Sequence, residues 1–186
     1  MADHGADATL LRKTARIAGL MLLLSLMVPT LNWVFVLSRF IVPRNEIETA
    51  HNVLANEFLF RVGVVGDLIT SAVAVVLALA LYVVLQSVGR TFALLALLLK
   101  LMEAIFWAVI ALGHLAASLI LKGIASSRAI ESEQIRALVG LLLNEQVTMN
   151  AVPGVFLGLN SMVFLYLLVR SKYVPGMLAG FGVLSY

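Results

Sequence analysis

Hydrophobic residues gather into long runs that are separated by short polar connections. A helix of about 20 apolar residues spans the hydrocarbon core of a bilayer, and four runs approach or exceed that length. They cover about residues 17–37, 58–86, 92–121 and 152–168. A fifth apolar segment, residues 174–186, is too short to cross a bilayer alone. The pattern predicts an all-α polytopic membrane protein, in which residues 1–186 form a single membrane domain of four complete transmembrane helices and a partial fifth apolar segment.

Two of the polar connections have the pattern of amphipathic helices. Asn45 and Glu48 have capping-box spacing, and apolar residues follow them at helical intervals. Between residues 129 and 150, apolar residues fall on one side of a helix and charged residues elsewhere. The apolar ones are Ile130, Ile135, Leu138, Val139 and Leu142. Both patterns predict short helices that lie on the membrane surface.

Proline and glycine mark the expected breaks in the helices. Pro29 falls inside the first run, where it favours a kink. Gly89 and Arg90 separate the second run from the third and predict a tight turn. Pro153 is expected to open the fourth transmembrane helix. Residues 1–14 are mostly polar, and we expect them to be disordered or interfacial.

Composition supports lipid as the solvent for most of the chain. Hydrophobic residues make up 62% of the sequence and charged residues 12%, with a mean hydropathy of +1.04. Soluble domains are about half apolar and about a quarter charged. The net charge of +3 comes from basic residues beside apolar runs, so the expected anionic partner is the lipid headgroup and not nucleic acid. The absence of cysteine excludes disulfides and thiol chemistry.

Charge is distributed unequally over the connections. Those on the side of the N-terminus carry six basic residues against two aspartates, and those on the other side carry five basic against six acidic residues. The six are Arg12, Lys13, Arg16, Arg90, Arg170 and Lys172. Cytoplasmic loops carry the excess of Lys and Arg. We therefore expect the N-terminus in the cytoplasm and the two long connections in the periplasm.

Three stretches carry a resemblance to a known family. They are Arg12-Lys-Thr-Ala-Arg-Ile-Ala-Gly19, Leu54-Ala-Asn-Glu-Phe-Leu-Phe-Arg-Val-Gly-Val-Val-Gly-Asp67 and Leu165-Tyr-Leu-Leu-Val-Arg-Ser-Lys-Tyr-Val-Pro175. Together they resemble a bacterial membrane family described only as a domain of unknown function, number four-three-eight-six. The resemblance implies a multi-pass protein of the bacterial inner membrane and supplies no activity. Members typically have six spans, which implies either that this chain is shortened within the fifth or that the remainder lies outside this sequence.

Polar residues inside the second and third runs follow helical spacing. On the second, Gly63, Asp67, Thr70, Ser71, Ala74 and Ala78 form one face; on the third, Lys100, Glu103, Trp107, His114 and Ser118 do. Ionisable groups inside a membrane mark function or helix association by default. The preferred interpretation is structural: Lys100 and Glu103 form an intramembrane ion pair, and the rest hold the bundle together. The alternative is a polar pocket or a proton path.

Three further residues are expected to form an intramembrane polar cluster. With 1.5 Å of rise per residue from the midpoint of each run, Asp67 lies roughly 9 Å, His114 roughly 11 Å and Asn32 roughly 5 Å towards the periplasm. Similar depth predicts that Asp67 approaches His114 within hydrogen-bonding or water-bridged distance, with Asn32 nearby. The cluster is either an interhelical clamp or a small ligand or proton site open to the periplasm.

The sequence contains no recognisable catalytic motif and no zinc-ligand or phosphate-loop spacing, so no cofactor or metal is expected. Our leading hypothesis is an accessory or stabilising subunit that acts by helix association within a larger membrane protein complex. The alternative is a small-molecule, ion or proton carrier that uses the polar intramembrane face. An enzyme acting on lipid ranks third.

Overall fold

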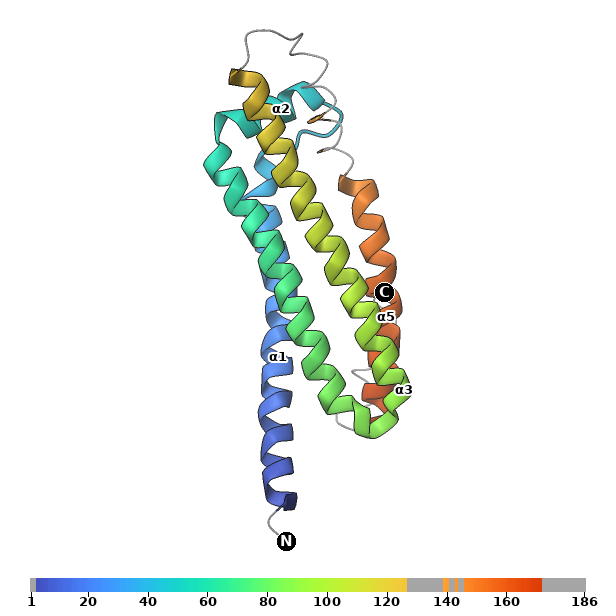
Figure 1. Cartoon of the computed structure of the whole chain (residues 1–186). Helices are drawn as coiled ribbons and strands as arrows, with labels where there is room; N and C mark the ends of the chain where they lie inside the picture. The colour runs from blue at the N-terminus through green and yellow to red at the C-terminus, as the bar shows by residue number, and fades with distance from the viewer. Residues whose placement is uncertain (1–2, 127–138, 141–142, 144–145, 172–186) are drawn as a thin grey trace. The chain divides into compact units, whose positions relative to one another are not determined.

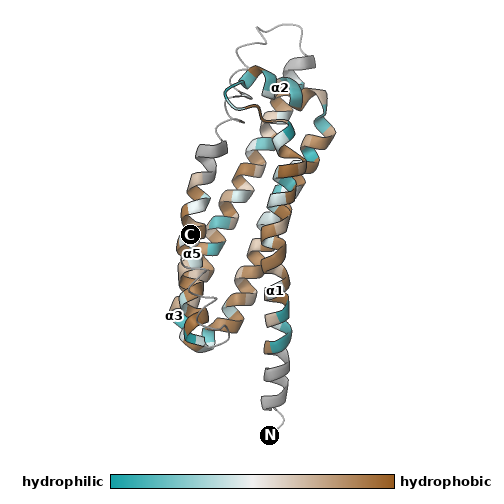
Figure 2. Ribbon diagram, turned by 180° about the vertical axis from the view of Figure 1, so that it is seen from behind, coloured by the Kyte–Doolittle hydropathy of each residue, from teal (hydrophilic) through white to brown (hydrophobic). Residues whose placement is uncertain are grey.

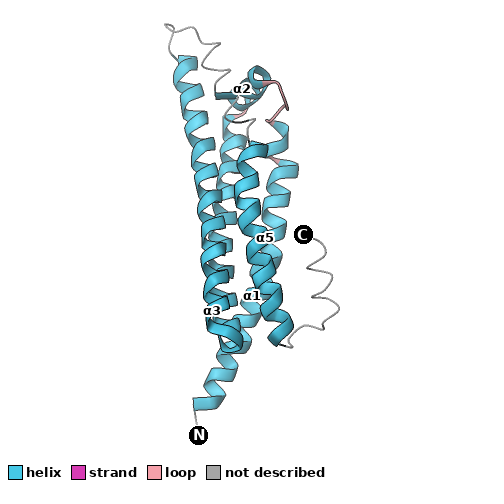
Figure 3. Ribbon diagram, turned by 90° about the vertical axis from the view of Figure 1, so that its right-hand side faces the viewer, coloured by secondary structure: helices cyan, strands magenta, loops and turns pink. Residues whose placement is uncertain are grey.

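The structure is a computed structural model that describes residues 3–126, 139–140, 143 and 146–171 (Figure 1). Its elements are α1 (Asp3–Phe35), the short 3₁₀ helix η1 (Leu37–Arg39), α2 (Glu46–Ala55), α3 (Glu57–Ser126) and α5 (Gln146–Ser171). The described residues contain no strand (Figure 3). The all-α fold is therefore confirmed. The partial segment 174–186 and most of the surface helix expected over residues 129–150 lie outside the described ranges.

Three described helical stretches are long and apolar enough to cross a membrane. They are Leu11–Arg39, Glu57–Gly123 and Ala151–Ser171. Figure 2 shows hydrophobic residues along the helices and hydrophilic residues gathered at α2 and at the turn within α3. These stretches indicate a membrane-embedded protein.

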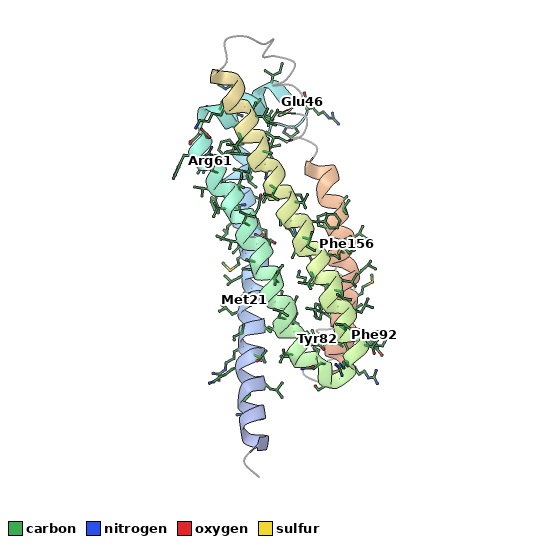
Figure 4. The ribbon with its side chains drawn as sticks, viewed as in Figure 1. Met21, Glu46, Arg61, Tyr82, Phe92 and Phe156 are labelled. Atoms are coloured by element: carbon green, nitrogen blue, oxygen red, sulfur yellow. The ribbon has the colours of Figure 1, made fainter. Side chains whose placement is uncertain are left out.

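Helix α3 reverses its direction at Gly89, whose φ of −173° and ψ of 93° are not helical. A straight α3 of 70 residues would be about 105 Å long. Instead, Oε2 of Glu57 at its start lies 3.2 Å from Nζ of Lys122 near its end. The two halves therefore run antiparallel (Figure 1), with Tyr82 and Phe92 on either side of the turn (Figure 4). The position of the break is the one that the sequence predicts.

The chain divides into two compact units, each made of separate segments, because α1 and α3 contribute to both. The first unit comprises Met1–Ser25, Ala72–Ile105 and Pro153–Tyr186. Its core packs Leu85, Ala93 and Ala96 of α3 against Phe164 and Leu167 of α5. The two alanines are fully buried, since a small side chain lets α5 approach the backbone of α3 closely.

The second unit comprises Leu26–Ser71 and Phe106–Val152. In its core, the rings of Phe40 and Phe60 meet edge to face with centroids 5.3 Å apart. Helix α2 buries Ala50 and Val53 in this core, whereas its His51 is exposed.

The start of α2 has the cap that the sequence predicts. Asn45 Oδ1 accepts a hydrogen bond from the Glu48 backbone N–H at 3.1 Å, and Asn45 Nδ2 donates to Glu48 Oε2 at 2.7 Å. Gly140 packs directly on the backbone of Glu46 in the first turn, where no larger residue fits. The first turn of α2 is therefore fixed by a side-chain cap and by a close backbone contact.

Two helix boundaries differ from those expected. α1 begins at Asp3, so most of the polar N-terminal segment is helical; it is rich in Ala, Leu, Arg and Lys, which have high helix propensity. α5 begins at Gln146, several residues before Pro153, whereas its membrane-spanning stretch begins at Ala151, close to Pro153, where the fourth span was expected to open. Pro153 is fully buried, and transmembrane helices tolerate an internal proline when neighbouring groups satisfy the freed carbonyl.

Candidate intramembrane polar site

The carboxylate of Asp67, in the first half of α3, is the centre of a buried polar cluster. Asp67 is only 5% exposed. Its Oδ1 accepts a hydrogen bond of 2.8 Å from Nδ2 of Asn32, and the same Nδ2 donates to the backbone oxygen of Gly63 at 2.9 Å. Asn32 belongs to α1 and is itself buried. This pair of bonds fixes the amide of Asn32 between a carbonyl and a carboxylate of α3.

His114 approaches the other oxygen of the same carboxylate from the second half of α3. Its Nδ1 lies 3.1 Å from Asp67 Oδ2. An ionised carboxylate only accepts, so when Asp67 is ionised, Nδ1 carries the proton and donates, whether the ring is neutral or charged. The ring of Phe60 lies edge to face with the imidazole at a centroid distance of 5.9 Å. Hydrogen bond and ring packing together set the orientation of the imidazole.

Glycines on α3 make room for this arrangement. A Cβ added at Gly66 would lie 2.6 Å from Oδ1 of Asn32, which is closer than non-bonded atoms come. Gly63, Gly66 and Asp67 share one helical face through spacings of three and four residues. The face of α3 that meets Asn32 therefore presents the carbonyl of Gly63, the open space at Gly66 and the carboxylate of Asp67 within about one helical turn.

Two cavities lie beside the cluster, and His114 lines both. The smaller has a volume of about 130 Å³ and is lined by Pro29, Trp33, Leu37, Asp67, Trp107, Ile110 and His114. The larger, of about 410 Å³, has an almost wholly apolar wall that includes Phe106, Val109, Ile120 and Leu143. The smaller cavity thus joins an ionisable pair to both tryptophans of the chain.

Lys100 and Glu103 form a second buried group, which belongs to the first unit. Lys100 Nζ lies 2.9 Å from each oxygen of Glu103, and both residues are at most 6% exposed. The two charges cancel within one turn of a single helix. Neither residue lines either of the two cavities described above.

A third charged group lies where the two ends of α3 meet. Glu57 pairs with Arg61 within the first turns of the helix and with Lys122 near its end; Figure 4 shows Arg61 at this position. The side chains of Arg61 and Lys122 are 42% and 62% exposed, so solvent or headgroups screen these charges. This group fastens the open end of the α3 hairpin.

The structure brings together Asn32, Asp67 and His114, and separately Lys100 and Glu103, as their spacing predicts. Sequence reasoning placed Trp107 on the polar face of the third run but did not predict that Trp33 and Trp107 line the same cavity. One signal was available, because Trp107 lies two helical turns before His114 on the same polar face. Trp33 directly follows Asn32, and no periodicity distinguishes it from its apolar neighbours.

The geometry limits what the site can do chemically. The Asp67–His114 pair can hold or release a proton, and the cavity beside it has room for more than one water molecule, whose share of liquid volume is about 30 Å³. Within the described ranges, no group of three or more His, Asp or Glu side chains gathers as metal ligands do. The site therefore suits a proton or a small solute.

Comparison with known proteins finds a family whose model matches most of the chain. The model of a family described as "Domain of unknown function (DUF4386)" matches residues 17–186, which is nearly the whole chain. No curated protein matches the sequence, and no solved structure matches the fold. The match agrees with the resemblance carried by the three sequence stretches.

Proposed function

The chain belongs to the DUF4386 family, whose description defines no activity, and we propose from the geometry of the polar site that the protein is a small membrane carrier. Its proposed cargo is a small solute, moved with or against a proton. One observation carries the proposal: the buried carboxylate of Asp67 is held by Asn32 and His114 on the wall of a 130 Å³ cavity.

The cavity is what favours a binding site over a simple clamp. A hydrogen-bonded clamp between helices needs three side chains in contact and no space beside them. An ionisable group within a membrane segment is costly and marks a substrate, ion or proton path by default. Asp67 and His114 both border open volume, so a ligand that enters it meets both groups.

The proposed topology has four crossings, with the N-terminus in the cytoplasm of a bacterium and the protein in its inner membrane. Four crossings follow if each half of α3 spans the bilayer, and the reversal at Gly89 supports this. Basic residues at Arg12, Lys13 and Arg16 and at the turn residue Arg90 favour the cytoplasm for the N-terminus and the turn.

Cysteine labelling tests this topology without background, because the chain has no cysteine. Ser87→Cys lies beside the turn of α3, and His51→Cys lies on the exposed face of α2. In intact cells, an impermeant maleimide should label the variant at residue 51 and not the one at residue 87. Equal labelling of both, or the reverse pattern, contradicts the proposed orientation.

A ligand screen on the purified full chain tests the carrier proposal. A ligand at 100 times its Kd stabilises the folded state by about 2.7 kcal/mol, which raises the unfolding temperature by several degrees. We expect at least one class of small cationic, anionic or neutral solute to stabilise the wild type and to leave Asp67→Asn unaffected. Thr70→Val is the matched control, since Thr70 is a buried neighbour on α3 that does not line the cavity.

Two results would contradict the carrier proposal. One is a screen in which no solute class stabilises the wild type. The other is a solute that stabilises the wild type and Asp67→Asn equally. Should Asp67→Asn fail to fold, Trp33→Leu serves in its place, because Trp33 also lines the cavity and takes no part in the hydrogen bonds of Asp67.

An accessory or stabilising subunit is the second candidate, and the surface of α1 favours it. Within the stretch Leu11–Arg39, only 11% of an 18-residue apolar window is buried within the chain, against 33% of the corresponding window in α3. Among the described residues, no atom outside the adjacent backbone of α1 lies within 4 Å of where a Cβ of Gly19 would be. Gly19→Leu is therefore harmless to the isolated chain and disrupts only a helix packed there from a partner. Purification in mild detergent followed by mass spectrometry tests this: a partner lost in Gly19→Leu supports it, and a clean monomer contradicts it.

A further inference from the structure

We propose that the 130 Å³ cavity binds an organic ammonium group in exchange for a proton of the Asp67–His114 pair. The inference rests on the carrier proposal, which assigns the same cavity, and it names the class of substrate. Three features of the cavity lead to it: its charge, its aromatic wall and its lack of oxygen ligands.

The charge of the cavity favours a cation. Of the residues that line it, only Asp67 and His114 ionise. The titratable residues of α1 all lie between Asp3 and Arg16, at least 16 residues before Asn32, whose amide binds Asp67. At the end of α3, Glu57 pairs with both Arg61 and Lys122, so this separate group has one more cation than anion. With a neutral imidazole, the Asp67–His114 pair places one negative charge on the cavity wall, which complements a bound cation.

The aromatic wall favours an organic cation. Both tryptophans of the chain line the cavity, and the indole face is the strongest aromatic partner for a cation, above all for alkylammonium groups. The rest of the wall includes Pro29, Leu37 and Ile110, which suit the methyl groups of such a ligand. A carboxylate beside two indoles is the chemistry that recognises ammonium groups.

The same wall is unsuited to a metal cation. Ca²⁺ takes six to eight oxygen ligands and Mg²⁺ six. Among the residues that line the cavity, one carboxylate supplies side-chain oxygens, and each of its oxygens already accepts a hydrogen bond or faces Nδ1 of His114. A hydrated metal ion would lose its water ligands here without replacement, whereas an alkylammonium ion has few to lose.

Exchange follows from electroneutrality. In the empty site, one additional proton resides on the Asp67–His114 pair, so that the pair is neutral. When the ammonium ion enters, that proton leaves to the aqueous side and the pair becomes a carboxylate beside a neutral imidazole. The site then carries one negative charge and the ligand one positive charge. One cation enters as one proton leaves, and the total charge is unchanged.

Choline and its neutral carbon isostere, 3,3-dimethyl-1-butanol, test the inference directly. The two have the same shape and differ in the positive charge. Titration of the purified full chain is followed by tryptophan fluorescence, because both emitting residues border the cavity, and by calorimetry in two buffers of different ionisation enthalpy. We expect choline to bind at least about thirtyfold more tightly than the isostere, with release of up to one proton and an affinity that rises about tenfold per pH unit while that proton is exchanged.

Variants identify the groups responsible. Asp67→Asn should weaken choline binding at least about thirtyfold, and Trp33→Leu about fivefold to thirtyfold. His114→Gln keeps the charge of Asp67, so choline should still bind, with a changed pH profile. Thr70→Val, the control beside Asp67, should bind as the wild type does. If Asp67→Asn does not fold, the comparison of Trp33→Leu with Thr70→Val decides in its place.

An ammonium group could come from a free solute or from a lipid headgroup, and reconstitution separates the two sources. Nanodiscs of phosphatidylglycerol alone are compared with nanodiscs that also contain phosphatidylethanolamine. Weaker choline binding in the second indicates that the lipid headgroup competes for the cavity. Equal binding indicates a free solute as the source.

Two outcomes overturn the inference. One is binding of the isostere as tight as that of choline, and the other is binding of choline that neither Asp67→Asn nor Trp33→Leu weakens. If another solute class instead stabilises the wild type through Asp67, the ammonium inference fails and the carrier proposal stands. If no solute class does so, both fail.

Discussion

The two buried ionisable groups of this protein are built in opposite ways. Lys100 and Glu103 lie one turn apart on a single helix, with 2.9 Å between the ammonium nitrogen and each carboxylate oxygen. Asp67 and His114 are brought together by the reversal of α3, and Asn32 joins them from α1. The first group is complete as soon as one helical turn forms. The second exists only after distant segments of the chain have packed.

The two groups also differ in their net charge and in whether they border a cavity. The Lys100–Glu103 pair carries no net charge and does not line the described cavities. The Asp67–His114 pair carries a charge that depends on one proton and borders open space. A self-neutralising pair is suited to holding its helix in the membrane, whereas a pair with a variable charge beside a cavity is suited to exchange. The following changes separate these two roles.

The largest effect is expected from breaking the Lys100–Glu103 pair on one side. Lys100→Leu removes the cation that pairs with the buried carboxylate of Glu103, and we expect a loss of about 3–5 kcal/mol in the free energy of unfolding. Replacing both residues by leucine should be milder, because no charge remains buried. Unfolding in mixed detergent micelles measures both. A double variant as unstable as the single one would show that the pair is not the relevant unit.

A smaller loss is expected from filling the space that admits Asn32. Gly66→Ala places a Cβ 2.6 Å from Asn32 Oδ1 and displaces the amide from its two hydrogen bonds, which should cost about 1–3 kcal/mol. Gly113→Ala on the same helix meets no atom within 4 Å and should be neutral or slightly stabilising. Equal stability of the two variants would contradict the close approach of Asn32.

The hydrogen bond between Asn32 and Asp67 should contribute less to the free energy of unfolding than is lost when the space at Gly66 is filled. Hydrogen bonds between membrane helices average about 0.6 kcal/mol and rarely exceed 2. A double-mutant cycle of Asn32→Ala and Asp67→Ala should therefore give a coupling energy in that range. A coupling well above 2 kcal/mol would mean that the cluster is chiefly a structural clamp.

The smallest effect is expected at Thr70, whose hydroxyl bonds only to the carbonyl of Gly66 on its own helix at 2.9 Å. Thr70→Val keeps the shape and removes a local bond, so stability should change by less than about 0.5 kcal/mol. The ligand binding of this variant should match that of the wild type. A larger change in either would show that the polar network extends one turn beyond Asp67.

The all-α fold and the break at Gly89 followed from sequence because both depend on local properties: run length, and a glycine between two apolar runs. The contact of Asp67 with His114 also followed, because similar depth on two antiparallel helices limits which residues can meet. The cavity did not follow. It depends on the rotation of α1, which presents Trp33 beside Trp107, and apolar residues around α1 give no period from which that rotation could be derived.

The start of the fourth span near Pro153 also followed from sequence, because it depends on where the apolar run begins; the apolar stretch of α5 begins at Ala151. The helix itself begins earlier, at Gln146. Sequence rules treat proline as a helix start or a break, whereas Pro153 is buried inside α5, as transmembrane helices allow.

The turn at Gly89 leaves α3 with no loop that could absorb a change of length. One residue inserted between Asp67 and Gly89 would rotate Asp67 by about 100° around the helix axis and carry its carboxylate away from both Asn32 and His114. Seven inserted residues would restore the facing direction to within about 20° but shift Asp67 by about 10 Å along the axis. The length of this hairpin is therefore as specific to the site as the identity of its side chains, and insertions or deletions within it should abolish binding even though every site residue is retained.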